Sequence, residues 1–329
     1  MPMTTRWGIA ATGGMAAAFA TDLALVPDAE LAFVGSRTPE RAAEFAGRFS
    51  ATGSGTYREL LAADLDVVYI ATPHPQHHAL ALAAIEAGVP VLVEKAFTAT
   101  LAGAREVVDA ARAAGLFCME AMWTRFQPAV VRAKELIDAG EIGEPLLVQA
   151  DFGAERVYDP SSRLFDLSLG GGSVLDLGVY PISLAQHVLG RPDRVTITGT
   201  TYPNGADRSA AIHLAHDDGR AAALVCTLAA QTPGRAVVVG TEGSVELVPP
   251  FHHAQRLVVR RSGGDPEELE LPATGTGYSH QAVEVQRCLA EGLTESPTMP
   301  LDDTLDVQWV LAECLDQLGI EIGEGTVEV

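Results

Sequence analysis

The amino-acid sequence predicts an α/β protein: a doubly wound parallel sheet, followed by a C-terminal α/β domain with an open, mostly antiparallel sheet. In the first half, short apolar strands alternate with helical segments, which is typical of parallel strands joined by right-handed crossovers. In the second half, stretches of alternating polarity follow one another with few helices between them, which indicates an antiparallel sheet lying on helices. We expect one domain at residues 1–122 and another at 123–329, whose last helices either stay there or pack back on the first domain.

The expected elements follow from the periodicity of the apolar residues. The strands of the first half are expected at residues 7–10, 28–35, 67–71, 91–97 and 117–121. The strands of the second half are expected at residues 146–152, 194–200, 209–216, 221–229, 235–240, 244–248 and 256–261. Helices are expected at residues 15–25, 101–114, 173–189, 278–291 and 303–318, and as shorter segments between the first strands.

The composition excludes several classes of function. The net charge of −21 repels phosphate backbones and anionic lipid, so we expect neither nucleic acid nor a membrane as partner. The four cysteines have no paired spacing and are expected as reduced, buried thiols rather than disulfides or a zinc site. The Ala-rich segment after Arg6 is interrupted by Gly13, Gly14 and Asp22, so we interpret the chain as a cytoplasmic protein without a signal peptide.

The stretch 91–97 carries the strongest chemical signal. It is an apolar strand that ends on Glu94 and Lys95, and sites in open α/β sheets collect at the carboxyl ends of strands. The chain has only two lysines, Lys95 and Lys134, against twenty arginines. An ammonium is compact and can titrate whereas a guanidinium cannot, so Lys95 is a candidate catalytic residue. A solvated strand end with an incidental ion pair is the alternative.

The first turn has the context of a dinucleotide-binding motif, since a strand precedes it and a helix follows. Its spacing is the degenerate Ala11-x-Gly13-x-x-Ala16, where the strict motif has three glycines. We expect a pyrophosphate at the helix N-terminus, although a simple glycine-rich turn remains the alternative. The cofactor-binding residues expected here are Ala11, Thr12, Gly13, Gly14 and Met15.

The end of the second strand favours NADP(H) over NAD(H). Enzymes for an unphosphorylated ribose usually have an acid there, whereas this chain has Ser36, Arg37 and Thr38, with Arg41 one turn later. Hydroxyls and guanidinium groups suit a 2′-phosphate through charge-assisted hydrogen bonds. Exposed arginines beside a capped helix are the alternative.

A loop with Thr72, Pro73, His74 and His77 follows the strand at 67–71, and we expect it to line the cofactor site. Three histidines within five residues raise the possibility of a metal, but no cysteine or carboxylate cluster has ligand spacing to them. We therefore expect no metal.

A second candidate site element follows Gly170-Gly171-Gly172. Asp176 and Tyr180 are four residues apart, so they are expected on one helix face, which Ser183 and His187 continue. A carboxylate and a phenol so placed could complete a proton-transfer site. A helix whose Tyr180 is half-buried core is the alternative.

Several segments together resemble the Gfo/Idh/MocA oxidoreductases. Within that family the chain is most similar to the group of dimeric dihydrodiol dehydrogenase, NADP-dependent D-xylose dehydrogenase and glucose–fructose oxidoreductase. The resemblance covers nearly the full chain, and its specific blocks are Met-Glu-Ala-Met-Trp-Thr-Arg-Phe at 119–126 and Asp-Leu-Gly-Val-Tyr-Pro at 176–181. It implies a Rossmann domain, a C-terminal α/β domain and a homodimer through the C-terminal sheet, with a tetramer as the larger assembly.

The resemblance also implies that Lys95 is the catalytic lysine of a Glu-Lys-Pro motif and that Tyr180 is the acid/base residue. Ala96 stands where that motif has proline, and Ala11 stands where the glycine motif has glycine. The remaining expected cofactor-binding residues are Glu94, Lys95, Trp123 and Arg125. The expected substrate-binding residues are Lys95, Trp123, Phe152, Arg163, Asp176 and Tyr180, of which Asp176 also counts as catalytic.

These residues lead to one functional hypothesis and one alternative. The hypothesis is hydride transfer between NADP(H) and a secondary alcohol or ketone of a sugar or cyclic polyol, with Lys95 polarising the carbonyl and Tyr180 moving the proton. The alternative is a non-catalytic, NADP(H)-sensing regulatory protein on the same fold. A sensor has no need of a proton donor, which favours the enzyme.

Overall fold

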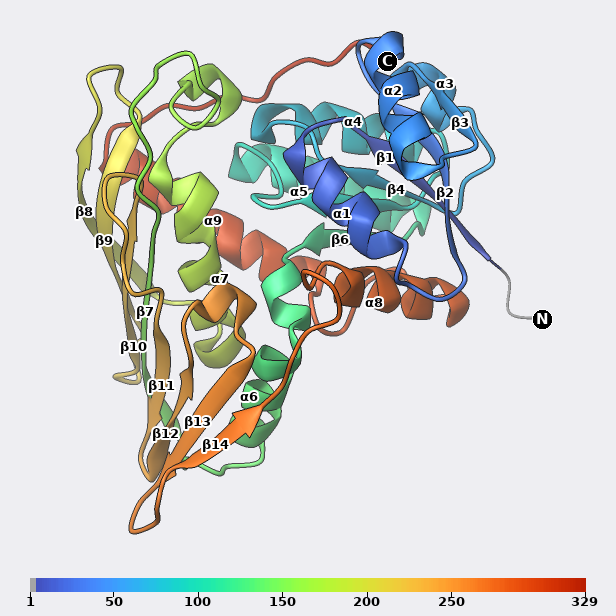
Figure 1. Ribbon diagram of the computed structural model, residues 1–329. Coiled ribbons are helices and arrows are strands. Elements are labelled where there is room, and N and C mark those ends of the chain that lie inside the picture. Colours follow the sequence, from blue (N-terminus) through green and yellow to red (C-terminus); the bar gives the residue numbers. More distant parts are fainter. Residues whose placement is uncertain (1–3) are drawn as a thin grey trace. The chain divides into compact units, whose positions relative to one another are not determined.

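The computed structural model describes residues 4–329, and the chain divides into two compact units. Unit 1 comprises the residues up to Trp123 together with Thr274–Thr304 and Gly323–Val329. Unit 2 comprises Thr124–Ala273 and Leu305–Ile322. Each unit contains one sheet of its own (Figure 1).

The sheet of unit 1 is parallel and has the strand order β3-β2-β1-β4-β5-β6. Its strands are β1 (Thr5–Ala10), β2 (Ala29–Gly35), β3 (Gly53–Gly55), β4 (Val67–Ile70), β5 (Val91–Glu94) and β6 (Cys118–Ala121). The chain grows outward from β1 in both directions, which is the doubly wound order. The predicted parallel sheet is therefore confirmed.

The helices of unit 1 connect these strands, apart from α8, which comes from the later segment of the unit. They are α1 (Gly14–Leu23), α2 (Pro39–Phe49), α3 (Tyr57–Leu61), α4 (His74–Glu86), α5 (Leu101–Ala114) and α8 (Ser279–Ala290). The hydroxyl of Thr100 accepts a hydrogen bond from Gly103 N and so caps α5. The carboxylate of Glu324 accepts from both the amide and the hydroxyl of Thr100, at 2.8 and 2.7 Å, which ties the end of the chain to this cap.

The sheet of unit 2 has the strand order β14-β13-β12-β11-β7-β10-β9-β8. Its strands are β7 (Pro145–Gly153), β8 (Arg194–Thr201), β9 (Asp207–Ala215), β10 (Ala221–Thr227), β11 (Ala236–Gly240), β12 (Gly243–Leu247), β13 (Arg256–Arg261) and β14 (Glu267–Glu270). Neighbouring strands are antiparallel except for β7 and β10, which pair in parallel. The predicted, mostly antiparallel sheet is confirmed.

Helices cover one face of this sheet, as Figure 1 shows for α6 and α7. Apart from α8 of unit 1, the helical segments after β6 are η1 (Trp123–Phe126), α6 (Pro128–Asp138), η2 (Leu167–Leu169), η3 (Val174–Gly178), α7 (Val179–Leu189), η4 (Phe251–His253) and α9 (Leu301–Gln317). Along β9 and β10 the buried residues alternate with exposed ones. That alternation is what a sheet with a single covered face requires.

Three elements differ from the sequence prediction. The edge strands β3 and β14 were not predicted, because Gly-Ser-Gly and Glu-Glu-Leu-Glu lack the apolar alternation of a half-buried strand. The helix expected over residues 173–189 begins instead as a π-helix, η3, and continues as α7. Single-turn π-helices occur frequently at functional sites.

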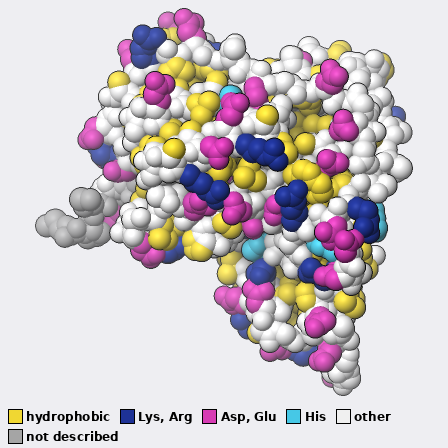
Figure 2. Space-filling view, turned by 180° about the vertical axis from the view of Figure 1, so that it is seen from behind, with side chains coloured by type: hydrophobic (Ala, Val, Ile, Leu, Met, Phe, Trp, Pro, Cys, Tyr) yellow, Lys and Arg dark blue, Asp and Glu magenta, His cyan; other side chains and the backbone are white. Residues whose placement is uncertain are grey.

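The surface and the thiols agree with the composition. On the face drawn in Figure 2, acidic side chains are spread widely with basic ones between them. All four cysteines are buried and none of them is in a disulfide, as predicted. Among residues 4–329, no helix has the length and apolar character that crossing a bilayer would need.

Candidate functional site

The turn between β1 and α1 has the geometry of a phosphate site. Gly13 is the N-cap of α1, and no side chain within the described chain caps this helix end, so its first amides can bind an anion. A Cβ at Gly13 or Gly14 would meet no atom within 4 Å, so the space above the turn is open. Ala11 has φ 139°, a region that glycine adopts readily and alanine does not. The alanine therefore takes the glycine conformation of the motif, with backbone strain.

At the end of β2, the residues expected at a 2′-phosphate lie together. Ser36 is buried, and its hydroxyl accepts from the amide of Thr38 at 3.3 Å. Arg37 is exposed, and Arg41 is exposed in the first turn of α2. Two exposed guanidinium groups and a hydroxyl at the end of the strand next to β1 suit an anionic ligand.

The loop after β4 contacts the loop after β5 through one histidine. The two ring nitrogens of His77 lie 2.7 Å from Thr72 O and 3.0 Å from Ala96 O. A neutral ring can donate only one of these two hydrogen bonds. Burial nevertheless dominates and lowers the pKa of His77 to about 4, against the raising effect of the carbonyl groups. His77 is therefore a neutral residue that holds the two loops together, while His74 is buried beside it with ring centroids 5.8 Å apart.

Lys95 follows β5, where a carboxylate positions its backbone. Glu94 is 4% exposed and accepts from the phenol of Tyr69 at 2.5 Å and from the amide of Lys95 at 3.2 Å. Tyr69 in turn stacks on Phe19 of α1, with ring centroids 3.9 Å apart. The peptide bond between Lys95 and Ala96 is cis, and Ala96 is fully buried. The hydrogen bond from the Lys95 amide to Glu94 and the one between His77 and the Ala96 carbonyl hold the backbone on both sides of the lysine.

A tyrosine that the sequence did not single out joins two predicted residues of unit 1. Trp123 is 5% exposed and packs on Tyr278, with ring centroids 4.3 Å apart. The Tyr278 hydroxyl lies 3.9 Å from the sulfur of Met15, at the start of α1. The buried carboxylate of Asp22 accepts from the amides of Thr276 and Tyr278, which fixes this loop. The glycine-rich run before Tyr278 was the available signal for such a loop.

In unit 2, Tyr180 lies in an aromatic cluster. It is 6% exposed, and its ring centroid is 5.3 Å from that of Phe152 and 5.6 Å from that of His252. Tyr180 and Phe152 were both predicted as site residues, whereas His252, more than seventy residues away from Tyr180 in the chain, was not. Only the pairing of distant strands brings these rings together.

Asp176 lies one turn before Tyr180 and forms an ion pair with Arg163 at 3.2 Å. The carboxylate is largely buried, whereas the Arg163 side chain is 47% exposed. Two residues predicted for the substrate site are therefore in direct contact. The guanidinium fixes the orientation of the carboxylate within the loop–helix junction.

Another predicted residue of unit 2, Arg125, contacts side chains of α7. Arg125 is 2% exposed, and its guanidinium donates to Ser183 Oγ at 3.1 Å and to Gln186 Oε1 at 2.6 Å. These contacts tie η1 to α7; a cofactor contact of Arg125 stays a prediction.

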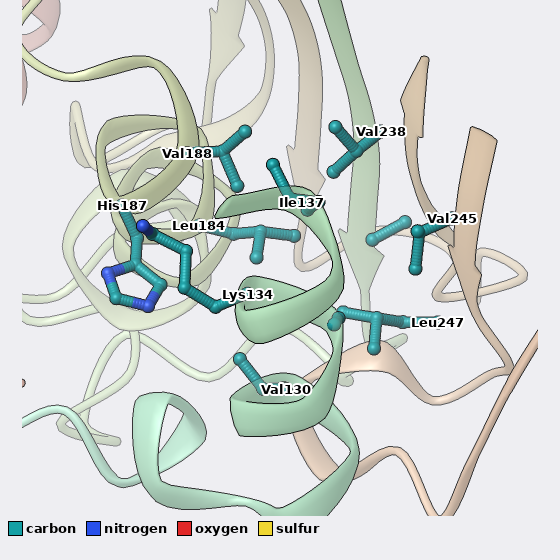
Figure 3. Close-up of a pocket in the computed structure, with 11 residues that line it drawn as sticks. Val130, Lys134, Ile137, Leu184, His187, Val188, Val238, Val245 and Leu247 are labelled. Atoms are coloured by element: carbon teal, nitrogen blue, oxygen red, sulfur yellow. The ribbon is translucent and has the colours of Figure 1, made fainter. Parts of the chain in front are cut away.

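His187 was expected to continue the Asp176–Tyr180 face, and it lies in a small apolar cavity between α6, α7 and the sheet. Lys134 of α6 lies beside its ring, among valine, leucine and isoleucine side chains (Figure 3). Burial, and after it the charges of Arg125 and Lys134, lowers the pKa of His187 to about 2. His187 is therefore a neutral core residue. The described chain contains no group of three His, Cys, Asp or Glu side chains placed to hold a metal ion.

The doubly wound sheet with an open, uncapped helix N-terminus defines the class of dinucleotide-binding proteins. Residues 5–122 match the model of the oxidoreductase family with an NAD-binding Rossmann fold, and residues 130–246 match the GFO/IDH/MocA C-terminal domain. The chain belongs to the GFO/IDH/MocA family of oxidoreductases.

Individual relatives match over nearly the full chain. Trans-1,2-dihydrobenzene-1,2-diol dehydrogenase of Bos taurus is 34% identical over 97% of this chain and 98% of its own length. D-xylose 1-dehydrogenase (NADP(+)) of Hypocrea jecorina is 33% identical over 98% of this chain and 94% of its own. The solved structure of a levoglucosan dehydrogenase in complex with NADH and levoglucosan has a TM-score of 0.87 at 24% identity, covering 96% and 97% of the two chains, so it supports the fold alone.

Proposed function

We propose that this protein transfers a hydride between NADP(H) and a secondary alcohol or ketone of a sugar or cyclic polyol. The main support for the proposal is Lys95, which lies at the carboxyl end of β5 with its backbone amide bound to Glu94, in a chain of this oxidoreductase family. Relatives of similar identity are named for a dihydrobenzene diol and for D-xylose, both of which carry secondary alcohols.

The nicotinamide supplies the hydride chemistry when it is bound. Lys95 would donate a hydrogen bond to the substrate oxygen on which negative charge develops during reduction. Tyr180 would give the proton to that oxygen, or remove it in the oxidative direction. Asp176, oriented by Arg163, would hold a neighbouring substrate hydroxyl, and Phe152 and Trp123 would form apolar walls.

The test replaces each proposed catalytic residue. Lys95→Ala and Tyr180→Phe should each lower kcat by about 10²–10⁴, since each removes one hydrogen-bonding or proton-transfer group from the transition state. NADPH binding, measured by fluorescence, should persist in both variants. Lys134→Ala is the matched control because this only other lysine forms a surface pair with Asp138.

Wild-type kcat in both variants would remove these roles. NADPH binding with no turnover of any sugar, inositol or dihydrodiol would point instead to a sensing protein.

The preference for NADP(H) rests on Ser36, Arg37 and Arg41. Arg37→Ala should weaken NADPH binding about tenfold or more and leave NADH binding unchanged, because only NADPH carries the 2′-phosphate. Arg48→Ala is the control, because Arg48 lies near the other end of α2 with its guanidinium over the ring of Phe49. Tighter binding of NADH than of NADPH by the wild type would contradict this preference.

For the assembly, we propose a homodimer through the uncovered face of the unit 2 sheet, or a tetramer made of two such dimers. Val225 is 40% exposed on this face and pairs in register with Ala211 of β9. Small apolar residues in the middle of an uncovered sheet face suit face-to-face packing of two copies. Sedimentation of Val225→Glu should show monomers where the wild type shows dimers. The cytoplasmic location stays a prediction.

A further inference from the structure

The short helix η4 presents a histidine that no step of the proposed reaction uses. Phe251 anchors this turn in the core, where it is fully buried and its amide donates to Gly234 O at 2.8 Å. The hydroxyl of Thr124 donates to the carbonyl of His252 at 3.0 Å. The backbone on both sides of the His252 side chain is therefore fixed, and the fold sets the direction of its ring.

The His252 ring lies flat on Phe152, with centroids 4.1 Å apart and an angle of 14° between the planes. It is 5.6 Å from the ring of Tyr180, the proposed acid/base residue. Phe152 and Tyr180 also contact each other edge to face at 5.3 Å. His252 is half-buried: one side of the ring packs in the cluster and its Nδ1 is enclosed, so only part of the ring is open to a ligand.

An imidazole differs from the phenyl ring beneath it in one chemical respect. Both are flat and offer an apolar face, but the imidazole edge carries two nitrogens that donate or accept hydrogen bonds. A wall with a nitrogen open at its edge binds a ring whose hydroxyls can reach that nitrogen better than a ring of equal size without hydroxyls. Sites built to hydrogen-bond a substrate hydroxyl discriminate strongly against analogues without it, whereas purely apolar walls discriminate weakly.

We propose that His252 is a substrate-binding residue that selects polyhydroxylated, saturated rings, such as aldopyranoses and inositols, over diols on an apolar ring. This inference rests on the proposed function, because it assigns His252 to the same site as Tyr180. The relatives do not decide between these substrate classes, since a dihydrobenzene-diol enzyme and a xylose enzyme are 34% and 33% identical to the chain. We infer the choice between these substrate classes from the polar edge of the His252 ring.

The experiment measures kcat/KM with D-xylose, D-glucose, myo-inositol and trans-1,2-dihydrobenzene-1,2-diol for the wild type and three variants. The wild type should favour one of the sugars or the inositol over the diol. His252→Phe keeps the stack on Phe152 and removes the polar edge, so the ratio of the best polyol to the diol should fall at least tenfold. The fall should lie mainly in KM for the polyol.

Two further variants separate recognition from packing. His252→Asn keeps hydrogen-bonding groups and removes the stacked ring, so it should lose less of the polyol preference than His252→Phe does. His253→Phe alters the neighbouring histidine of the same turn, whose ring contacts Gln255, and should leave the ratio unchanged. Melting temperatures and NADPH affinity are measured for all three.

The outcomes separate this inference from the proposed function. A wild type that turns over these compounds, with an unchanged ratio in folded His252→Phe and His252→Asn, would overturn the role of His252 alone. A wild type that prefers the diol would also overturn it while leaving the oxidoreductase intact. A wild type that turns over none of these compounds would overturn both.

Discussion

The two residues proposed for proton and charge chemistry are held in different ways. Lys95 of unit 1 follows a strand, and side chains from the adjacent segments bind its backbone: Glu94 at its amide and His77 at the next carbonyl. Tyr180 of unit 2 stands on a helix, and what fixes it is the start of that helix together with aromatic packing. The position of Lys95 thus depends on hydrogen bonds to its own and the next residue. The position of Tyr180 depends on a helix cap several residues before it.

The cap of the tyrosine helix comes from β9. The carboxylate of Asp207 is buried and accepts from the hydroxyl of Ser173 at 2.6 Å and from the amide of Val174 at 2.7 Å. Burial raises the pKa of Asp207. Gly172, with φ 133°, is required beside it, because a Cβ there would collide with the carboxylate.

The largest expected effect is a pH dependence from the histidine of the lysine segment. The pKa of His77 is about 4 in the folded state and 6.5 in the unfolded chain. Between these two pH values the unfolded state therefore binds a proton at His77 that the folded state does not bind. The free energy of unfolding should therefore fall by up to about 3 kcal/mol between pH 6.5 and pH 4.

Denaturant titrations at pH 7, 5.5 and 4.5 measure this loss, and in His77→Gln it should be smaller by a similar amount. Parallel pH profiles of wild type and variant would contradict the assignment of a neutral His77.

The next effect concerns the tyrosine helix. Asp207→Ala should lower the free energy of unfolding by about 2 kcal/mol, because it removes a helix cap and leaves a buried hydroxyl without its acceptor. It should also lower kcat while NADPH affinity stays unchanged, since all the expected cofactor residues except Arg125 are in unit 1. Asp207→Asn, which retains an acceptor oxygen, should recover most of both losses. Equal losses of stability and kcat in the two variants would contradict the role of Asp207 as the acceptor that caps this helix.

The smallest expected effect concerns the hydrogen bonds from Tyr69 to Glu94 and from the Lys95 amide to Glu94. Tyr69→Phe keeps the stack on Phe19 and removes the hydrogen bond to Glu94, which should cost about 1.5 kcal/mol of unfolding free energy. Because Glu94 holds the Lys95 amide, kcat should fall about tenfold as well. Tyr202→Phe, a phenol of unit 2 stacked on Tyr158, is the control and should leave kcat unchanged. Stability lost with unchanged kcat would mean that Tyr69 is structural only.

Sequence reasoning succeeded where the signal is local. The strand before Lys95 was expected from its β-branched residues and the turn Gly88-Val89-Pro90 before it, and β5 lies within the predicted stretch. It failed for β3 and β14, which are strands because of the neighbours with which they pair and not because of their own pattern. The π-helical turn at Val174 has no sequence signature of its own, since a helix period is expected in either case.

The sequence by itself determined the class of fold, the glycine turn, the unusual lysine at a strand end and the group of residues after the triple glycine. Each of these depends on residues close together in the chain, whose spacing reflects local backbone geometry. Only the tertiary structure decided that Tyr69 and His77 hold the Lys95 segment, that Asp207 caps the tyrosine helix and that His252 lies on Phe152. Such contacts join segments far apart in sequence, because sheet pairing and burial bring them together and no local period records them.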